Sequence, residues 1–109
     1  MLVFAAVMSA SVQVLAQRVA HLGGAANIGC GEYLQDRKED RYAQFYSQWV
    51  LGFIAGYNFY GSRPQTSTTP KEATIHAYLE KFCRENPLKD VGLGAMTLIT
   101  DLGGQGIAK

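Results

Sequence analysis

The two cysteines of this 109-residue chain, Cys30 and Cys83, restrict its fold more than any other feature. A chain of this length encloses a single hydrophobic core, and two cysteines allow a single intramolecular bridge. A metal-binding pair or a catalytic thiol has little support, because the chain has no Cys-x-x-Cys spacing and no histidine beside either cysteine. We therefore predict a structural disulfide, which stabilises the fold by roughly 4 kcal/mol in the chain-entropy model.

The N-terminal residues indicate export. Residues 1–16 form an apolar run without a charge, which ends at Ala16 and is followed by the polar Gln17 and Arg18. This pattern is typical of a secretory signal peptide that is cleaved after Ala16. A membrane anchor is the weaker interpretation, because spanning a bilayer takes about 20 apolar residues. We expect the chain to be periplasmic or secreted, in a compartment where disulfides persist.

The composition narrows the class of partner. Ten Lys and Arg residues balance nine Asp and Glu residues, so no excess of charge draws the chain to nucleic acid or to an anionic membrane. Apolar residues make up 48% of the chain and charged residues 17%, which is typical of a folded domain. We expect no nucleic-acid partner and no stable membrane insertion.

The helical domain is expected between residues 30 and 102. Residues 17–29 contain a glycine pair and lack a clear period, which predicts a flexible lead-in, with order beginning near Cys30. Residues 31–41 mix apolar and charged side chains and predict a short amphipathic helix. Residues 103–109 begin with a second glycine pair and predict a frayed tail.

Residues 42–60 predict the central helix and hold most of the aromatic residues. Apolar side chains recur there at helical spacing, in one series of Phe45, Trp49 and Phe53 and another of Tyr46, Val50 and Ile54. Core packing is favoured over a stacking surface for bases or sugars, because no basic residues are interleaved. Gly52 and Gly56 are four residues apart on one face, and we predict that another helix crosses there.

Residues 61–69 are polar and rich in turn formers, which predicts an exposed loop. Thr69 and Glu72 form a Thr-x-x-Glu capping box, and Pro70 suits the first position of a helix. We therefore predict that the next helix begins at Pro70.

Two apolar stripes follow. The first carries Cys83, so the disulfide is expected to face the core; its other members are Ile75, Tyr78, Leu79 and Phe82. Asn86 and Pro87 are predicted to end this helix and to cap the next one. The second stripe consists of Leu88, Val91, Ala95, Leu98, Ile99 and Leu102.

One group of side chains has the composition of a functional site. His76 lies four residues from Glu72 and four from Glu80, on a face that we expect to be exposed. Such a trio suits a metal ion or pH sensing, but charged neighbours at this spacing more often form a solvated face. The chain has no Gly-x-Ser-x-Gly, P-loop or His-Glu-x-x-His motif. We expect no catalytic residue, no metal and no cofactor, and therefore a binding protein rather than an enzyme.

Three segments resemble known families. The segments are Cys30-Gly-Glu-Tyr-Leu, Trp49-Val-Leu-Gly-Phe-Ile-Ala-Gly-Tyr and Phe82-Cys-Arg-Glu-Asn-Pro-Leu. The chain resembles the type VI secretion amidase-immunity (Tai-type) proteins, which have a Gly-Tyr-x-x-Gly-like middle helix and a cysteine before a proline in the penultimate helix. It also resembles the HdeA/HdeB-like periplasmic acid-stress chaperones, which share a helix bundle and one disulfide.

Each resemblance implies a function. The immunity resemblance implies a dimer that blocks a peptidoglycan-cleaving toxin, with an exposed loop entering the toxin's cleft. The loop here is 61–69, and its expected partner-binding residues are Ser62, Arg63, Gln65, Thr66, Ser67 and Thr68. The chaperone resemblance implies acid-triggered exposure of apolar surface to unfolding client proteins, for which residues 42–60 supply aromatic side chains. Nine acidic residues balanced by ten basic ones single out no acid switch, which argues against the chaperone.

The sequence therefore predicts an all-α, four-helix bundle-like mini-domain with one disulfide, which acts in the periplasm by binding protein. An immunity or inhibitor protein that blocks a cell-wall-targeting effector, as a homodimer, is the leading hypothesis. An HdeA-like acid-stress chaperone and a structural envelope protein without an inhibitory role are the alternatives.

Overall fold

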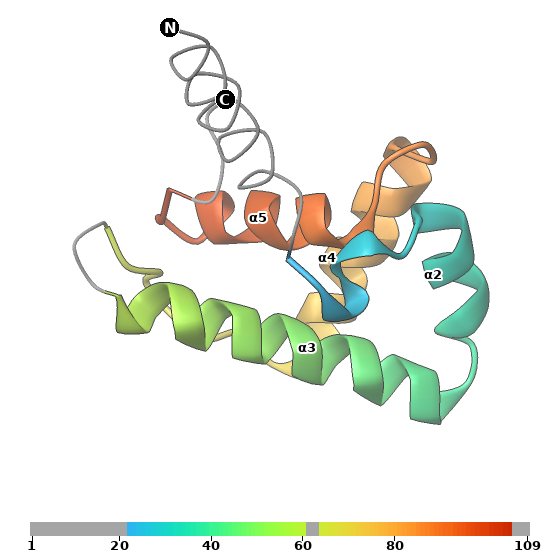
Figure 1. Cartoon of the computed structure of the whole chain (residues 1–109), viewed down its shortest axis with the longest axis horizontal. Helices are drawn as coiled ribbons and strands as arrows, with labels where there is room; N and C mark the ends of the chain where they lie inside the picture. Colours follow the sequence, from blue (N-terminus) through green and yellow to red (C-terminus); the bar gives the residue numbers. More distant parts are fainter. Residues whose placement is uncertain (1–21, 61–63, 106–109) are drawn as a thin grey trace, which may run out of the picture.

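The fold is all-α, as predicted. The computed structural model describes residues 22–60 and 64–105. Within these ranges it contains four α-helices and a short 3-10 helix (Figure 1), and its β-structure is limited to an isolated bridge between Gly29 and Asp90. The elements are η1 (Gly24–Asn27), α2 (Cys30–Asp36), α3 (Asp40–Phe59), α4 (Glu72–Glu85) and α5 (Val91–Asp101). No helix in these ranges is long and apolar enough to cross a membrane.

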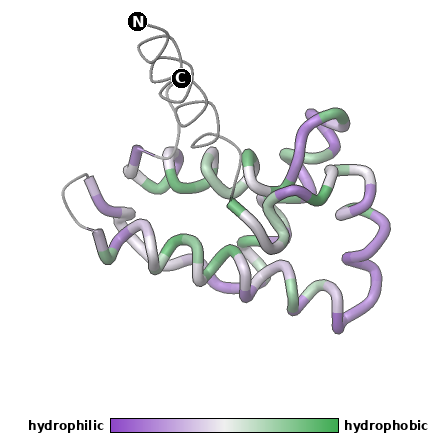
Figure 2. The backbone as a smooth tube through the Cα atoms, in the orientation of Figure 1, coloured by the Kyte–Doolittle hydropathy of each residue, from purple (hydrophilic) through white to green (hydrophobic). Residues whose placement is uncertain are grey.

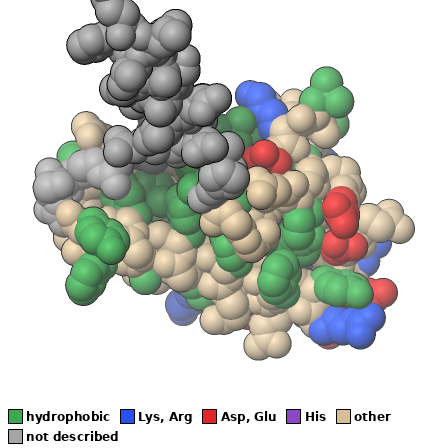
Figure 3. Space-filling view, in the orientation of Figure 1, with side chains coloured by type: hydrophobic (Ala, Val, Ile, Leu, Met, Phe, Trp, Pro, Cys, Tyr) green, Lys and Arg blue, Asp and Glu red, His purple; other side chains and the backbone are tan. Residues whose placement is uncertain are grey.

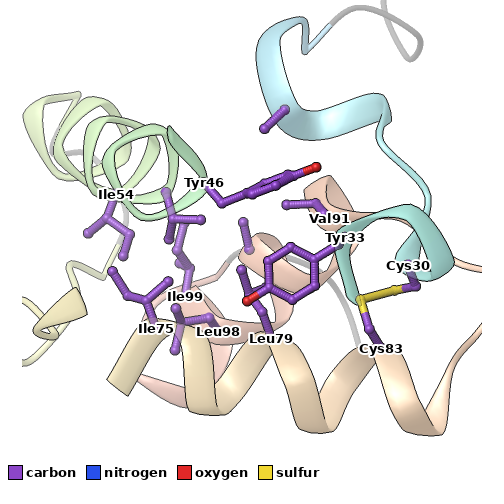
Figure 4. Close-up of a cluster of buried hydrophobic side chains, with 13 residues drawn as sticks. Cys30, Tyr33, Tyr46, Ile54, Ile75, Leu79, Cys83, Val91, Leu98 and Ile99 are labelled. Carbon is purple, nitrogen blue, oxygen red and sulfur yellow. A yellow bond between two sulfur atoms is a disulfide. The ribbon is translucent and has the colours of Figure 1, made fainter. Parts of the chain in front are cut away.

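The core lies where α3, α4 and α5 face one another, with α2 against α4 (Figure 4). The predicted stripes supply it, because side chains three and four residues apart share a helix face. Its fully buried members include Tyr46, Val50 and Ile54 of α3, Ile75 and Leu79 of α4, and Ala95 and Ile99 of α5. Hydrophilic residues concentrate in α2 and in its turn into α3 (Figure 2), so the short helix contributes few side chains to this core.

The predicted disulfide is present and faces the core. Cys30 and Cys83 are both fully buried, with their Cα atoms 4.8 Å apart. The bond joins the first residue of α2 to the last turn of α4 across 53 residues of chain. It therefore fixes the entry of α2 against the far end of α4.

Order begins earlier than Cys30, so the prediction of a flexible lead-in is wrong for residues 24–29. Ala25 and Ala26 of η1 are buried against α5. The following chain pairs with the α4–α5 turn: the Val91 amide donates to the Ile28 carbonyl, and the Cys30 amide donates to the Lys89 carbonyl, both at 2.9 Å. A Cβ atom at Gly92 would come within 2.9 Å of the Ala26 carbonyl oxygen, so this approach requires a glycine.

The helices α4 and α5 both begin later in the sequence than predicted. α4 begins at Glu72 instead of Pro70, and its first turn has no side-chain cap, so the Thr69 capping box does not form. Pro70 is buried, and the Glu72 carboxylate binds α3 instead of its own helix. α5 begins at Val91, where Asp90 caps it by accepting from the Leu93 amide at 2.9 Å. Leu88 precedes this cap and is 99% exposed, so it does not belong to the apolar stripe.

Hydrogen bonds fix the start of the C-terminal tail, so the prediction of fraying is wrong for residues 103–105. The Gly104 amide donates to the Ile99 carbonyl at 2.9 Å, and the Gln105 amide donates to the Tyr57 hydroxyl at 2.7 Å. Gly103 has a φ of 97°, a conformation that suits glycine after a helix end. The chain thus turns back onto α3 after α5. The rest of the predicted tail lies outside the described residues.

Removing the disulfide should lower the free energy of unfolding by about 4 kcal/mol, because the bridge restricts the unfolded chain over the 53 residues that it closes. Urea unfolding of the oxidised protein and of a Cys30→Ser/Cys83→Ser variant measures the difference. The reduced wild type should unfold at the same urea concentration as the variant. Equal midpoints for the oxidised and variant proteins would contradict a stabilising role.

Candidate functional site

The predicted partner-binding loop is partly described. Ser62 and Arg63 lie outside the described residues. Gln65, Ser67 and Thr68 are exposed, and Thr66 is half-buried. The exposed part of the loop is therefore polar, as the sequence indicates.

Hydrogen bonds fix this loop against the end of α3. The Asn58 side chain donates to the Thr66 hydroxyl at 2.9 Å and accepts from the Thr66 amide at 3.0 Å. The Gln65 side chain donates to the Asn58 carbonyl at 2.9 Å, and the Ser67 amide donates to the Leu102 carbonyl at 2.8 Å. Residues 65–67 are therefore tied to α3 and to the end of α5, and their shape is set before any partner arrives.

The Tyr57 hydroxyl joins the loop to the C-terminal chain. It donates to the Pro64 carbonyl and accepts from the Gln105 amide. One side chain of α3 thereby holds two segments that are far apart in the sequence. Sequence reasoning placed Tyr57 in the central helix but gave it no partner, because both bonds are to backbone groups that periodicity does not locate.

Two aromatic side chains stand exposed at the same end of α3. Phe59 is 83% exposed and Tyr60 is 78% exposed, and their rings meet edge to face with centroids 5.5 Å apart. We call Phe59, Tyr60 and residues 64–68 the loop platform. The sequence interpretation of this helix as core aromatics is wrong for these two, for Phe45, which is 49% exposed, and for Tyr42, which is 39% exposed.

The predicted helix crossing at Gly52 and Gly56 is not found within the described part of the chain. Both glycines are exposed, and a Cβ atom built on either one would meet nothing within 4 Å. Close helix packing occurs instead at Gly94 of α5, where a Cβ atom would come within 2.9 Å of Leu79. Figure 3 shows hydrophobic side chains reaching the surface along α3, while charged side chains gather where α2 turns into it.

His76 is buried, which corrects its predicted exposure. It is only 9% exposed, and its Nδ1 lies 2.8 Å from the Tyr33 hydroxyl of α2. Its ring also hydrogen-bonds the backbone of Ala43 in α3, an interaction that raises its pKa. His76 therefore connects α4 to both α2 and α3.

The ionisation of this cluster follows from burial. Desolvation lowers the pKa of His76 below its ordinary value, and the nearby Arg37 guanidinium lowers it further. Burial also raises the pKa of Tyr33 to about 12, so its hydroxyl stays protonated and keeps its hydrogen bond with the neutral His76. Arg37 in turn forms an ion pair with Glu80 at 2.8 Å. The predicted trio is thus divided, because Glu80 binds Arg37 while Glu72 binds Ser47 and Gln48.

Residues 22–60 and 64–105 contain no group of three or more His, Cys, Asp and Glu side chains that could hold a metal ion. Two other tyrosines use their hydroxyls structurally: Tyr46 donates to Asp36 at 2.9 Å, and Tyr78 donates to Asp101 at 2.6 Å. The described residues offer a polar segment fixed by hydrogen bonds and exposed aromatic side chains at the surface, and a buried histidine in the interior.

The free energy of unfolding should fall as the pH drops below about 6.5, the ordinary pKa of histidine. The unfolded chain binds a proton at His76 in this range while the folded chain does not, so stability is present above that pH and is lost toward the lower, folded-state pKa. Urea unfolding at a series of pH values measures the slope. A His76→Gln variant should lose this part of the pH dependence, and an unchanged slope in the variant would contradict the assignment.

Comparison with known proteins finds no relative of this chain. Neither the protein-family models, nor the curated proteins, nor the solved structures with which the chain was compared contain a match. Function is therefore argued from the loop platform, the outer face of α3 and the His76 cluster, without support from a homologue.

Proposed function

We propose that this chain is an exported protein-binding protein of the immunity or inhibitor type, which blocks a cell-wall-targeting effector by docking the loop platform on it. One observation carries the proposal: a polar loop, fixed by hydrogen bonds to Asn58 and Tyr57, lies at the same end of α3 as two exposed aromatic side chains.

This composition is suited to a specific protein interface. Such interfaces combine a few aromatic anchors with a polar rim, and the anchors contribute most of the binding energy. Phe59 and Tyr60 are the available anchors, and Gln65, Ser67 and Thr68 supply hydrogen-bonding groups beside them. Because hydrogen bonds already fix residues 64–67, binding through them costs little additional conformational entropy. A pre-formed surface favours one partner over many clients.

The disulfide is consistent with the oxidising compartment in which an exported inhibitor would act. Structural disulfides persist in oxidising compartments and are rare in reducing cytosol. Cys30 and Cys83 are bonded and buried, which fits a protein that folds after export. The predicted signal peptide, residues 1–16, lies outside the described residues and stays part of the proposal.

Replacing the two anchors should weaken partner binding about 30-fold or more, because a hot-spot residue contributes at least about 2 kcal/mol. The variant is Phe59→Ser/Tyr60→Ser. Leu88→Ser is the matched control, since Leu88 is 99% exposed and lies in the α4–α5 turn. Neither substitution removes a buried side chain, so both proteins should fold.

The measurement has two stages. Periplasmic proteins retained by the wild type are identified by mass spectrometry, and the affinity of each variant for the retained protein is measured by calorimetry. Peptidoglycan hydrolysis by the retained protein is then measured with each variant present. Inhibition by the wild type and Leu88→Ser, with little by the double variant, is the expected result. Undiminished hydrolysis in the presence of wild type would reject the inhibitor function.

A second candidate, an HdeA-like acid-stress chaperone, draws support from His76. Its neutral ring joins α2 to α3 and α4, and the fully buried Tyr33 and Tyr46 lie between these helices. Protonation of His76 in acid weakens this contact, and loosening of α2 would expose aromatic surface to client proteins. The disulfide would keep the N-terminal end of α2 attached to α4 throughout.

If the chaperone function holds, the oxidised protein should suppress aggregation of unrelated proteins at about pH 3, below the ordinary carboxyl pKa values, and not at neutral pH. Light scattering by an acid-unfolded client measures the effect. The Cys30→Ser/Cys83→Ser variant tests whether the bridge is needed. Scattering that is the same with and without the protein at both pH values would eliminate this candidate.

A further inference from the structure

A second surface site lies at the corner where α2 turns into α3. It is a pocket of about 380 Å³, a volume within the range of small-ligand sites, which begins at roughly 300 Å³. Figure 3 shows hydrophobic side chains beside acidic and basic ones at this corner. We call this site the corner pocket, and its lining residues are Ile28, Asp36, Arg41, Tyr42, Phe45 and Tyr46.

The aromatic walls of the corner pocket combine a fixed back with an open rim. Tyr46 is buried and packs edge to face on Tyr33, so the core holds its ring in place. Phe45 meets Tyr46 edge to face, with ring centroids 5.3 Å apart. Tyr42 and Phe45 are exposed at the rim. A side chain that enters from solvent therefore meets aromatic rings that are already positioned.

Asp36 supplies the available charge of the corner pocket. The carboxylate accepts a hydrogen bond from the Tyr46 hydroxyl at 2.9 Å, but a carboxylate has about four acceptor positions, so others remain. Within residues 22–60 and 64–105, no Lys, Arg or His forms an ion pair with Asp36. The adjacent Arg37 pairs with Glu80 instead. The carboxylate thus lines a mainly apolar pocket without a cation of its own.

Arg41, the other charged lining residue, already has its partners. Its Nε lies 3.4 Å from the Glu39 carboxylate, and its guanidinium lies over the Tyr42 ring, 4.7 Å from the centroid. It also donates to the Tyr42 hydroxyl at 3.2 Å. Because the charge of Arg41 is compensated and that of Asp36 is not, the corner pocket is complementary to a cation.

We propose that the corner pocket binds an arginine side chain of a partner protein, with the guanidinium on the Asp36 carboxylate and against the Phe45 ring. A cation is attracted both to a carboxylate and to the face of an aromatic ring. Arginine suits this combination better than lysine, because its planar guanidinium forms paired hydrogen bonds with a carboxylate and stacks on aromatic rings. Its apolar stem packs along the apolar part of the pocket, at Ile28.

The open rim favours a protein residue over a free small molecule, because it leaves room for the backbone that carries the side chain. The corner pocket and the loop platform lie at opposite ends of α3. At a rise of 1.5 Å per residue, roughly 20 Å of helix separates Phe45 from Phe59. The corner pocket is therefore a separate contact site, and this inference does not rest on the proposed inhibitor function.

A pair of peptides tests whether the charge is recognised. The probe is N-acetyl-glycyl-arginyl-glycinamide, and its control carries citrulline, which has nearly the same shape without the charge. Amide chemical shifts of the oxidised full chain, followed by NMR, give the dissociation constants. The arginyl peptide should bind about tenfold more tightly or better, because hydrogen bonds between charged groups are the stronger ones. The largest shifts should lie at Asp36 and residues 41–46.

Substitutions in the corner pocket test the roles of its residues. Asp36→Asn should weaken binding of the arginyl peptide about tenfold, and its side-chain oxygen can still accept from the Tyr46 hydroxyl, so the fold is kept. Asp40→Asn is the matched control, because it removes the same charge from an exposed residue that does not line the pocket. Its affinity should equal that of the wild type. Phe45→Leu keeps an apolar wall but removes the ring face, and should weaken binding about threefold.

Three results would overturn the proposal, with circular dichroism showing that each variant is folded. Arginyl and citrullinyl peptides that bind equally well would show that the charge is not recognised. An Asp36→Asn protein that binds the arginyl peptide as tightly as Asp40→Asn would exclude the carboxylate as the contact. Amide shifts that are absent at the highest soluble peptide concentration, or that lie away from residues 36–46, would exclude the corner pocket as the site.

Discussion

The contact on which the rest of this structure depends is the bond between Cys30 and Cys83. α2 is only seven residues long, too short to be stable by itself in water. The disulfide attaches its first residue to α4 at a fully buried position, and Tyr33, one turn later, reaches His76 of the same helix. α2 is thereby fixed to α4 by a covalent contact and a polar one, and Tyr46 of α3 packs edge to face on the Tyr33 ring. The buried histidine has its partners because the cysteines bring α2 there.

The helices themselves could be predicted because they depend on local repetition. Side chains such as Tyr46, Val50 and Ile54 recur at the period of a helix, and the structure buries all three on the same side of α3. The stripe of α4 likewise predicted that Cys83 faces inward. The apolar stripes must face a common core and the two cysteines must meet, so few arrangements of the helices are possible. The observed bundle is one of them. The polar character of residues 64–68 was predicted for a similar reason, since turn formers are exposed almost wherever they occur.

Features that depend on distant partners could not be predicted in this way. His76 is four residues from two glutamates, which suggested a solvated trio, but its main partner is Tyr33, 43 residues away. η1 lacks periodicity, and its Ala25 and Ala26 are buried where Gly92 leaves room for Ala26. The glycines of α3 indicated a helix crossing, but spacing does not say whether the crossing helix belongs to the same chain. In the loop platform the exposure of Phe59 and Tyr60 was missed, because hydrophobic composition by itself does not distinguish a core face from an outer one.

The disulfide closes a ring of chain, and the elements of the fold lie either inside this ring or outside it. α2, α3 and all but the last two residues of α4 lie inside the closed ring of chain between Cys30 and Cys83, whereas η1 and α5 lie outside it. The two outer elements pack on each other at Gly92 and are joined through Ile28 and Val91. The disulfide therefore leaves these two elements without a covalent link to the ring beyond the backbone itself, and only packing and hydrogen bonds hold them on it. The side chains of Ala95, Leu98 and Ile99 thus belong to the part of the core that the cross-link does not secure.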